Sequence, residues 1–281
     1  MPAPYLALGL TGPHLVELTS SAALLARWDA LPAAFTVLGV ERVDGSPPAA
    51  RTLDSSAVGA ALAGQTTRGR FLIVASPQRD HPYNLARRVA SLGHLSRGRS
   101  GLLVGVRDAY AAPDRATAAR ARDAARAVRA LEQSWPHESI IGDRETGILV
   151  RSNEIVHVDI GGEFPIAGPL TVPEPPTGAS VIAWSGSADA PDAVDLVIGE
   201  GGAVAVAVLG ERPPRGTAGV LLRAEAEHSV DDVLTAAERL LAGDFRPLAA
   251  GPLRAALGLA APPPRANGRA AFPVPQPHPS L

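Results

Sequence analysis

The sequence predicts an α/β protein with a mostly parallel sheet, and the architecture we expect is a compact TIM-type (β/α)8 barrel. Short apolar runs alternate with segments of helical periodicity along most of the chain, which is typical of a parallel sheet flanked by helices. The 281 residues, 46% of them apolar, suffice for one large core, and a minimal barrel takes about 250 residues. Some of the candidate strands are short, so the barrel need not be complete, and periodicity alone also permits a doubly wound sheet.

The first half of the chain alternates regularly between the two kinds of segment. Apolar runs predict strands over residues 5–10, 34–40, 71–76 and 101–106. Helical spacing or alanine-rich composition predicts helices over residues 20–30, 55–65, 82–95 and 114–135. Asp54 or Ser55 is a natural N-cap for the second of these helices, and Pro82 is tolerated in the first turn of the third.

The second half begins with an irregular stretch. Residues 147–150 and 155–160 alternate like a short antiparallel excursion, after which apolar runs predict strands over residues 180–184, 195–199 and 203–209. A capping box, Ser229 with Asp232, opens a predicted helix over residues 229–242, and a last short helix covers residues 253–257. We therefore expect one barrel domain over residues 1–260 and a proline-rich tail, extended or disordered, over residues 261–281.

Composition excludes several classes of chemistry. The formal net charge is −2, so we expect no nucleic-acid partner and no polybasic membrane surface. All 26 basic residues are arginine, which excludes Schiff-base chemistry on lysine, and the absence of cysteine excludes disulfides and thiolate sites. The N-terminus lacks the pattern of a signal peptide and no apolar run is long enough to span a bilayer, so we expect a cytoplasmic protein.

The most specific string in the chain is DHPYNLARRVASLGHLSRGR, residues 80–99, on the helix between the third and fourth predicted strands. It resembles the signature of the luciferase-like flavin-dependent monooxygenases, in particular the branch that oxidises nitrilotriacetate and dibenzothiophene sulfone. The resemblance continues in chain order through AVGAALAGQTTRGRFLIVAS, AARAVRALEQSW, residues 156–184 and GPLRAALGL. It covers most of the chain, from about Leu53 to Leu259.

The resemblance implies a barrel that uses FMN. In this family reduced flavin, supplied by a separate flavin reductase, reacts with oxygen at the carboxyl ends of the strands, where barrel active sites lie. The implied activity is that of an oxidoreductase, a monooxygenase of a small organic substrate. The implied assembly is a homodimer or a heterodimer with a related chain.

The family's cofactor contacts can be carried over to particular residues. At the end of the third strand the resemblance places Ala75 and Ser76, whose small side chains would let a flat ring lie close, followed by Tyr83. For Tyr83, a capping and packing role is the alternative. His81 is a weak candidate for a catalytic proton donor near the flavin, and a hydrogen bond at the helix start is its alternative role.

The phosphate of the flavin is expected at the turn Ser185, Gly186 and Ser187, where backbone N–H groups and two hydroxyls at a helix start could form an anion nest. In most proteins such a turn is only a loop. No metal is expected, because the possible ligand pair His157 and Asp159 lies in the surface excursion of this family.

The chain also departs from the family pattern. The fourth strand reads GLLVGV in place of a Trp-Asn pair and a threonine, and the second strand has no carboxylate at its end before Glu41. Ala118 stands about where the family has a tyrosine, and the helix after Pro191 is largely deleted. These departures leave open a second interpretation, a degenerate, non-catalytic barrel that acts as a binding or partner subunit.

Overall fold

The protein folds into a closed barrel, as a computed structural model that describes residues 3–112, 114, 116–187, 189–225, 227–263 and 268–276 shows. Within these residues eight parallel strands close in the order β1-β10-β9-β8-β7-β4-β3-β2. The strands are β1 (Tyr5–Leu10), β2 (Thr36–Leu38), β3 (Phe71–Ala75), β4 (Ser100–Val104), β7 (Val181–Ser185), β8 (Leu196–Ile198), β9 (Val204–Val208) and β10 (Gly219–Arg223). The barrel expected from the sequence is therefore confirmed, and the doubly wound sheet is not formed.

Alternate residues of each strand face two different cores, as the period of two in a strand requires. Inside the barrel lie residues such as Ala7, Leu72 and Leu103. Between the strands and the helices lie residues such as Leu8 and Ile73. Both layers are buried, which explains why the strands read as continuous apolar runs rather than as alternating ones.

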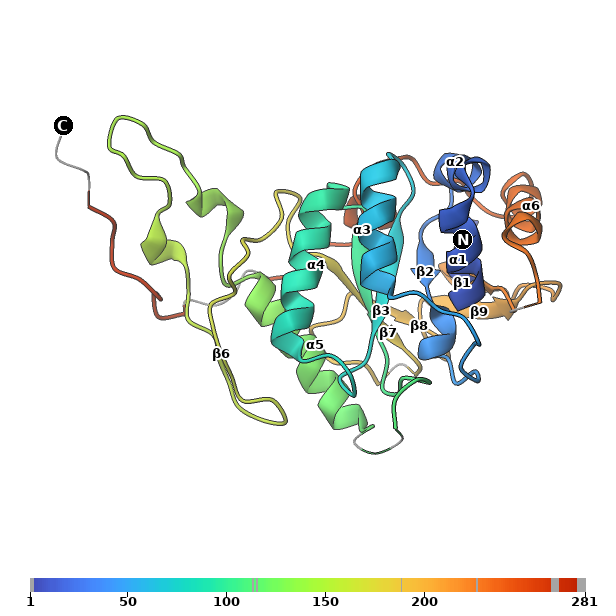
Figure 1. Cartoon of the computed structure of the whole chain (residues 1–281), viewed down its shortest axis with the longest axis horizontal. Coiled ribbons are helices and arrows are strands. Elements are labelled where there is room, and N and C mark those ends of the chain that lie inside the picture. The colour runs from blue at the N-terminus through green and yellow to red at the C-terminus, as the bar shows by residue number, and fades with distance from the viewer. Residues whose placement is uncertain are drawn as a thin grey trace.

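Helices cover only part of the barrel. They are α1 (Gly12–Ser20), α2 (Ala22–Ala30), α3 (Ser55–Gln65), α4 (Pro82–Ser96), α5 (Ala118–Glu132), α6 (Val230–Leu241) and α7 (Leu253–Leu257). Figure 1 shows α3, α4 and α5 side by side, and α6 beside α1 and α2 at the end of the molecule away from the arm. In the described part of the chain, no helix separates β7 from β8, β8 from β9 or β9 from β10. The chain thus closes the barrel while omitting helices that a regular (β/α)8 fold would carry.

A long excursion between α5 and β7 forms an arm. It contains the short helical turns His137–Ser139 and Ser152–Glu154 and the two-stranded sheet of β5 (Asp159–Ile160) and β6 (Ile166–Ala167). An antiparallel bridge joins Ile140 to Val150, so the antiparallel character expected here is present. Figure 1 shows the arm projecting away from the barrel, with the C-terminal segment running beside it. The described tail residues 268–276 lie against this arm, where Ala271 N donates to Ile155 O at 2.7 Å.

Several predicted boundaries need correction. Neither the strand β10 nor the helix α1, which begins at Gly12, was predicted. The predicted helix over residues 114–135 begins only at Ala118, because Thr117 caps it by accepting from Arg120 N. The strand predicted over residues 101–106 ends at Val104, which leaves Gly105 and its successors as the loop at the mouth of the barrel.

Candidate functional site at the mouth of the barrel

Two hollows lie side by side at the carboxyl ends of the barrel strands. They are separated by residues 44–46, here called the strap, which crosses the mouth after β2. The larger hollow, about 480 Å³, is lined by Val43, the strap, Ser185, Gly186, Ile198, Gly199, Val206 and Arg223. The smaller hollow, about 220 Å³, is lined by Arg42, Gly45, Ser46, Gln78 and residues of the loop after β4. In barrel proteins this end of the strands carries the functional face.

The strap is held in place by an ion pair across the mouth. Arg223, at the end of β10, donates through Nε to Asp44 at 2.5 Å and also bonds to the hydroxyl of Ser46. Both side chains of the Arg223–Asp44 pair are mostly buried. On the inner side Val43 fills the space beside Gly105, where a Cβ would lie 2.3 Å from the Val43 side chain. The segment from Val43 to Ser46 therefore forms a cover whose position depends on the end of β10 and on the loop after β4.

A second, fully buried ion pair lies beneath the smaller hollow. Arg42 Nη2 donates to Asp108 Oδ2 at 2.5 Å, and the two side chains are 8% and 0% exposed. Asp108 Oδ1 accepts from Tyr110 N at 2.8 Å, and Gln78 Oε1 accepts from Asp108 N at 2.7 Å. These bonds join the loops that follow β2, β3 and β4 into one rigid unit.

Glu41 is buried next to this pair. Its Oε1 accepts from Gly12 N and from the Tyr110 hydroxyl, each at 3.0 Å, while Oε2 is buried without a partner among the described residues. Burial raises the pKa of the Glu41 carboxyl, because the charged form loses its hydration. Burial and the nearby Glu41 carboxyl likewise raise the pKa of Tyr110. Glu41 is thus a carboxyl that holds its proton more readily than usual, placed at the functional end of the barrel.

The residues expected at the end of the third strand do not line either hollow. Ala75 is buried among the side chains that pack the strands against the helices. Ser76 is fully buried, and its hydroxyl donates to Val106 O at 3.3 Å, which ties the end of β3 to the loop after β4. Their contact with a cofactor stays a prediction.

His81 and Tyr83 lie at the start of α4, on the outer side of the barrel mouth. His81 is the N-cap, and its Nδ1 accepts from Tyr83 N at 3.3 Å, which confirms the hydrogen bond at the helix start. Tyr83 is half-buried and donates its hydroxyl to Pro169 O at 3.2 Å. That bond favours the packing alternative for Tyr83, because it fastens the arm to α4.

The turn Ser185, Gly186 and Ser187 does lie at the larger hollow, whose lining includes the first two of these residues. No helix begins there in the described residues, so the helix start expected at this turn is wrong. The Gly186 amide donates to Ile198 O at 3.0 Å and is therefore engaged within the protein. The half-buried Ser185 donates its hydroxyl to Val43 O at 3.4 Å, whereas Ser187 is exposed, so the Ser187 hydroxyl is the more accessible of the two to a ligand.

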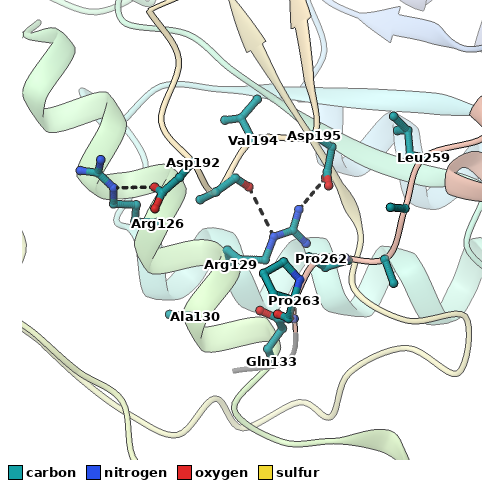
Figure 2. A pocket seen from close by; sticks show the side chains of 13 residues that line it. Arg126, Arg129, Ala130, Gln133, Asp192, Val194, Asp195, Leu259, Pro262 and Pro263 are labelled. Atoms are coloured by element: carbon teal, nitrogen blue, oxygen red, sulfur yellow. Dashed lines mark hydrogen bonds and ion pairs between the residues drawn. The ribbon is translucent and has the colours of Figure 1, made fainter. Parts of the chain in front are cut away.

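A third hollow, of about 490 Å³, lies at the opposite end of the barrel, between α5, the residues before β8 and the C-terminal segment. Figure 2 shows Arg126 turned toward Asp192 and Arg129 turned toward Asp195 on one wall, with Pro262 and Pro263 on the other. Arg129 and Arg254 both pair with Asp195, and both donate to Ser180 O. These contacts fix the starts of β7 and β8. Because the arginines are satisfied by the protein itself, we assign this groove a structural role.

The polar residues of the mouth were largely missed from the sequence. Arg42, Asp108 and Tyr110 follow directly after β2 and β4, in the words VERVD and VRDAY. Charged residues immediately after a predicted buried strand are the signal that could have found them. Their pairing could not be predicted, because Arg42 and Asp108 are 66 residues apart in the chain.

An eight-stranded parallel barrel with hollows at the carboxyl ends of its strands defines a TIM-barrel protein with its functional face at that end. The chain belongs to the luciferase-like monooxygenase family, whose family model matches residues 33–244. The family suggested by residues 80–99 is therefore confirmed.

Curated relatives match parts of the chain. It is 32% identical over 161 residues to one of the subunits of pristinamycin IIA synthase from Streptomyces pristinaespiralis, a match that covers 57% of this chain and 56% of the relative. It is 33% identical over 150 residues to nitrilotriacetate monooxygenase component A of Aminobacter aminovorans, covering 49% and 33%. The matches thus span about half or less of each relative's own length.

Solved structures agree on the fold. EDTA monooxygenase from Chelativorans sp. BNC1 superposes with a TM-score of 0.52 at 22% identity, covering 70% of this chain and 54% of that one. A long-chain alkane monooxygenase superposes with a TM-score of 0.53 at 19% identity, covering 67% of this chain and 53% of that one. Among the described residues, no helix is long and apolar enough to cross a membrane.

Proposed function

We propose that this protein is an FMN-dependent monooxygenase that uses reduced flavin and O2 to oxidise a small organic substrate. The observation that carries this proposal is the larger hollow at the mouth. Its volume of about 480 Å³ lies within the range of roughly 300–1,000 Å³ that small-molecule and cofactor sites occupy. Its position at the carboxyl ends of the strands is where barrel chemistry takes place.

The residues of the larger hollow fit a flavin. The 42% exposed Val206 and the half-buried Val43 offer apolar surface against which a flat ring can lie. The exposed Ser187 hydroxyl, next to the lining, offers a donor to the polar side chain of the cofactor. The Ser185 hydroxyl and the Arg223 guanidinium are further donors, although Ser185 already donates to Val43 O at 3.4 Å and Arg223 is paired with Asp44. Gly186 has a φ of +127° and its missing side chain leaves open space. When bound, reduced FMN supplies the electrons that activate O2.

The protein's own contribution is binding, orientation and exclusion of water. The strap lies across the mouth, and the Asp44–Arg223 pair holds it there, so it can shield the larger hollow from solvent. The buried Glu41 carboxyl, whose pKa is raised by burial, lies at the same end of the barrel. His81 keeps a helix-capping role, and we assign it no proton transfer.

We further propose that the protein works with partners, a flavin reductase and a second barrel chain, in a homodimer or a heterodimer. The names of two relatives support this, because one is a subunit of a synthase and the other a component of a monooxygenase. The arm supports it as well, since Ile140, Ile141 and Leu149 are 38%, 43% and 67% exposed there. A cytoplasmic location stays a prediction from the sequence.

The flavin assignment can be tested by fluorescence titration. We expect FMN fluorescence to be quenched with a Kd of tens of micromolar or tighter, about −6 kcal/mol or better. The double variant Ser185→Ala/Ser187→Ala is expected to bind about tenfold more weakly, because the phosphate loses two donors, about 1.4 kcal/mol. Thr19→Ala/Ser20→Ala, which removes two exposed hydroxyls from α1, is the matched control.

Two outcomes separate the interpretations. Absence of quenching in the wild-type protein would refute the enzyme proposal and favour the non-catalytic barrel. Equal FMN affinity of the wild-type protein and the Ser185→Ala/Ser187→Ala variant would be consistent with flavin binding but would refute the phosphate contact at this turn.

A further inference from the structure

The smaller hollow at the mouth carries more positive than negative charge. Two arginines line it, Arg42 from the turn after β2 and Arg107 from the loop after β4. The carboxylate of Asp108 is the acidic group of the same lining, and it is fully used. Its Oδ2 accepts from Arg42, and its Oδ1 accepts from the backbone of Tyr110.

Arg42 holds an unsatisfied donor. Its side chain is 8% exposed, and its Nε is buried without a hydrogen-bond partner among the described residues. An unmade hydrogen bond on a buried group destabilises the folded protein, and more so when the group is charged. Because Arg42 lines the hollow, a ligand oxygen that reached its Nε would supply the missing hydrogen bond.

Arg107 holds an uncompensated charge. It is exposed, it lines the hollow, and among the residues that the structure describes it has neither an ion-pair nor a hydrogen-bond partner. With Arg42 neutralised by Asp108, the hollow keeps the full positive charge of Arg107. Exposed arginines with a partner are common in this chain, for example Arg126 with Asp192, so the lack of one at a hollow is informative.

The other groups around the hollow do not offset this charge. Gln78 uses its Oε1 on Asp108 N, and its Nε2 donates to Ala112 O and Asp114 O. Asp44, the first residue of the strap, is paired with Arg223 in the larger hollow. The neighbouring Glu41 faces Gly12 and Tyr110.

We propose that the smaller hollow binds a small oxyanion group, a carboxylate or a phosphate, which accepts hydrogen bonds from Arg107 and from Arg42 Nε. Guanidinium groups match the geometry of both oxyanions. The volume of about 220 Å³ suits one anionic group rather than a whole cofactor. The site itself follows from the arginines, whereas the source of the anion, the substrate or the flavin, rests on the proposed function.

Calorimetric titration of the whole protein with sodium succinate and with sodium phosphate, at low ionic strength, tests the site. We expect at least one of the two anions to bind with a Kd of roughly 1 mM or tighter. Arg107→Gln should weaken that binding about tenfold, because it removes the charge and keeps a polar side chain. Arg239→Gln, on the exposed face of α6, is the matched control and should bind as the wild type does. No binding of either anion up to about 20 mM, or equal binding by Arg107→Gln, would overturn the proposal.

A second pair of titrations, with FMN and with riboflavin, identifies the source of the anion. If Arg107→Gln weakens FMN binding about tenfold and leaves riboflavin binding unchanged, the site takes the flavin phosphate in place of the turn at Ser185 and Ser187. If both flavins bind the variant as they bind the wild type while succinate is weakened, the site takes a substrate carboxylate. Absence of anion binding by the wild-type protein, with normal FMN quenching, refutes the anion site alone. Anion binding by the wild-type protein without FMN quenching refutes the proposed function alone.

Discussion

Arg126 and Arg129 lie one turn apart on α5, but their surroundings predict different contributions to the stability of the protein. Arg129 is 8% exposed and contacts Asp195, Glu132 and the carbonyl of Ser180, whereas Arg126 pairs with the 86% exposed Asp192. Removing one member of a buried charge network leaves the others unpaired and costs about 3–5 kcal/mol, but an exposed pair contributes less than about 1 kcal/mol. We therefore expect Arg129→Leu to lower the free energy of unfolding by about 3 kcal/mol or more, and Arg126→Leu to change it little. Urea unfolding of both variants measures this, and equal losses would contradict the structural role of the groove.

Glu174, near the start of the segment leading into β7, predicts a pH dependence. Burial, with the nearby carboxyls of Glu132 and Glu138, raises its pKa from 4.5 to about 7. A carboxyl whose pKa is higher in the folded state favours folding at low pH, and that contribution is lost as pH rises from about 4.5 to about 7. Because Glu174 is only half-buried, we expect solvent to reduce the energetic effect of its pKa shift. Glu174→Gln should raise the free energy of unfolding by about 1 kcal/mol at about pH 8 and leave it almost unchanged at about pH 4. Urea unfolding at both values tests this, with the exposed Glu200→Gln as control, and a gain that does not depend on pH would contradict it.

Among the helices and strands, prediction from the sequence succeeded best where local signals are strong. The bounds of β1, α3 and α7 agree with the structure, because apolar runs or helical spacing end there at clear breakers. Strand β10 was missed because its five residues directly follow a glycine- and proline-rich loop and are too few for periodicity to register. Helix α1 was missed because Thr11-Gly12-Pro13 is typical of a turn, yet Thr11 and His14 form a capping box that starts the helix there. For the mouth, only its location at the carboxyl ends of the strands was predicted. Its ion pairs were not, since they join residues far apart in the chain.

The contact between Gly105 and Val43 predicts how a substitution would affect the strap. A Cβ on Gly105 would lie 2.3 Å from the Val43 side chain, whose β-branching leaves it little freedom to move. Gly105→Ala should therefore displace Val43 and the strap and lower the free energy of unfolding by about 1–3 kcal/mol. Gly64→Ala in α3, where a Cβ meets nothing within 4 Å, should instead stabilise the protein by about 0.5–1 kcal/mol. Thermal unfolding compares the two, and an unaffected Gly105→Ala would show that Val43 does not hold the cover.

In the molecule as a whole, the barrel closes while the arm leaves apolar side chains in solvent. Leu149 is the most exposed of these, at 67%. If the arm contacts a second chain, Leu149→Asp should shift the protein from dimer to monomer in light scattering coupled to gel filtration, because a charge would be buried in the contact. Leu95→Asp, at a 60% exposed leucine on the helical flank, is the control. Dissociation by Leu95→Asp and not by Leu149→Asp would place the contact on α4 instead of the arm.

The proposed function depends above all on flavin binding at the carboxyl ends of the barrel strands, although a groove of similar volume lies at the other end. Hydrogen–deuterium exchange measured with and without FMN locates the flavin on the barrel. We expect slower exchange in peptides that cover residues 43–46 and 185–187, because bound flavin would shield these backbone amides. Protection confined to residues 126–133 and 192–195, or no protection at all, would contradict flavin binding at the mouth.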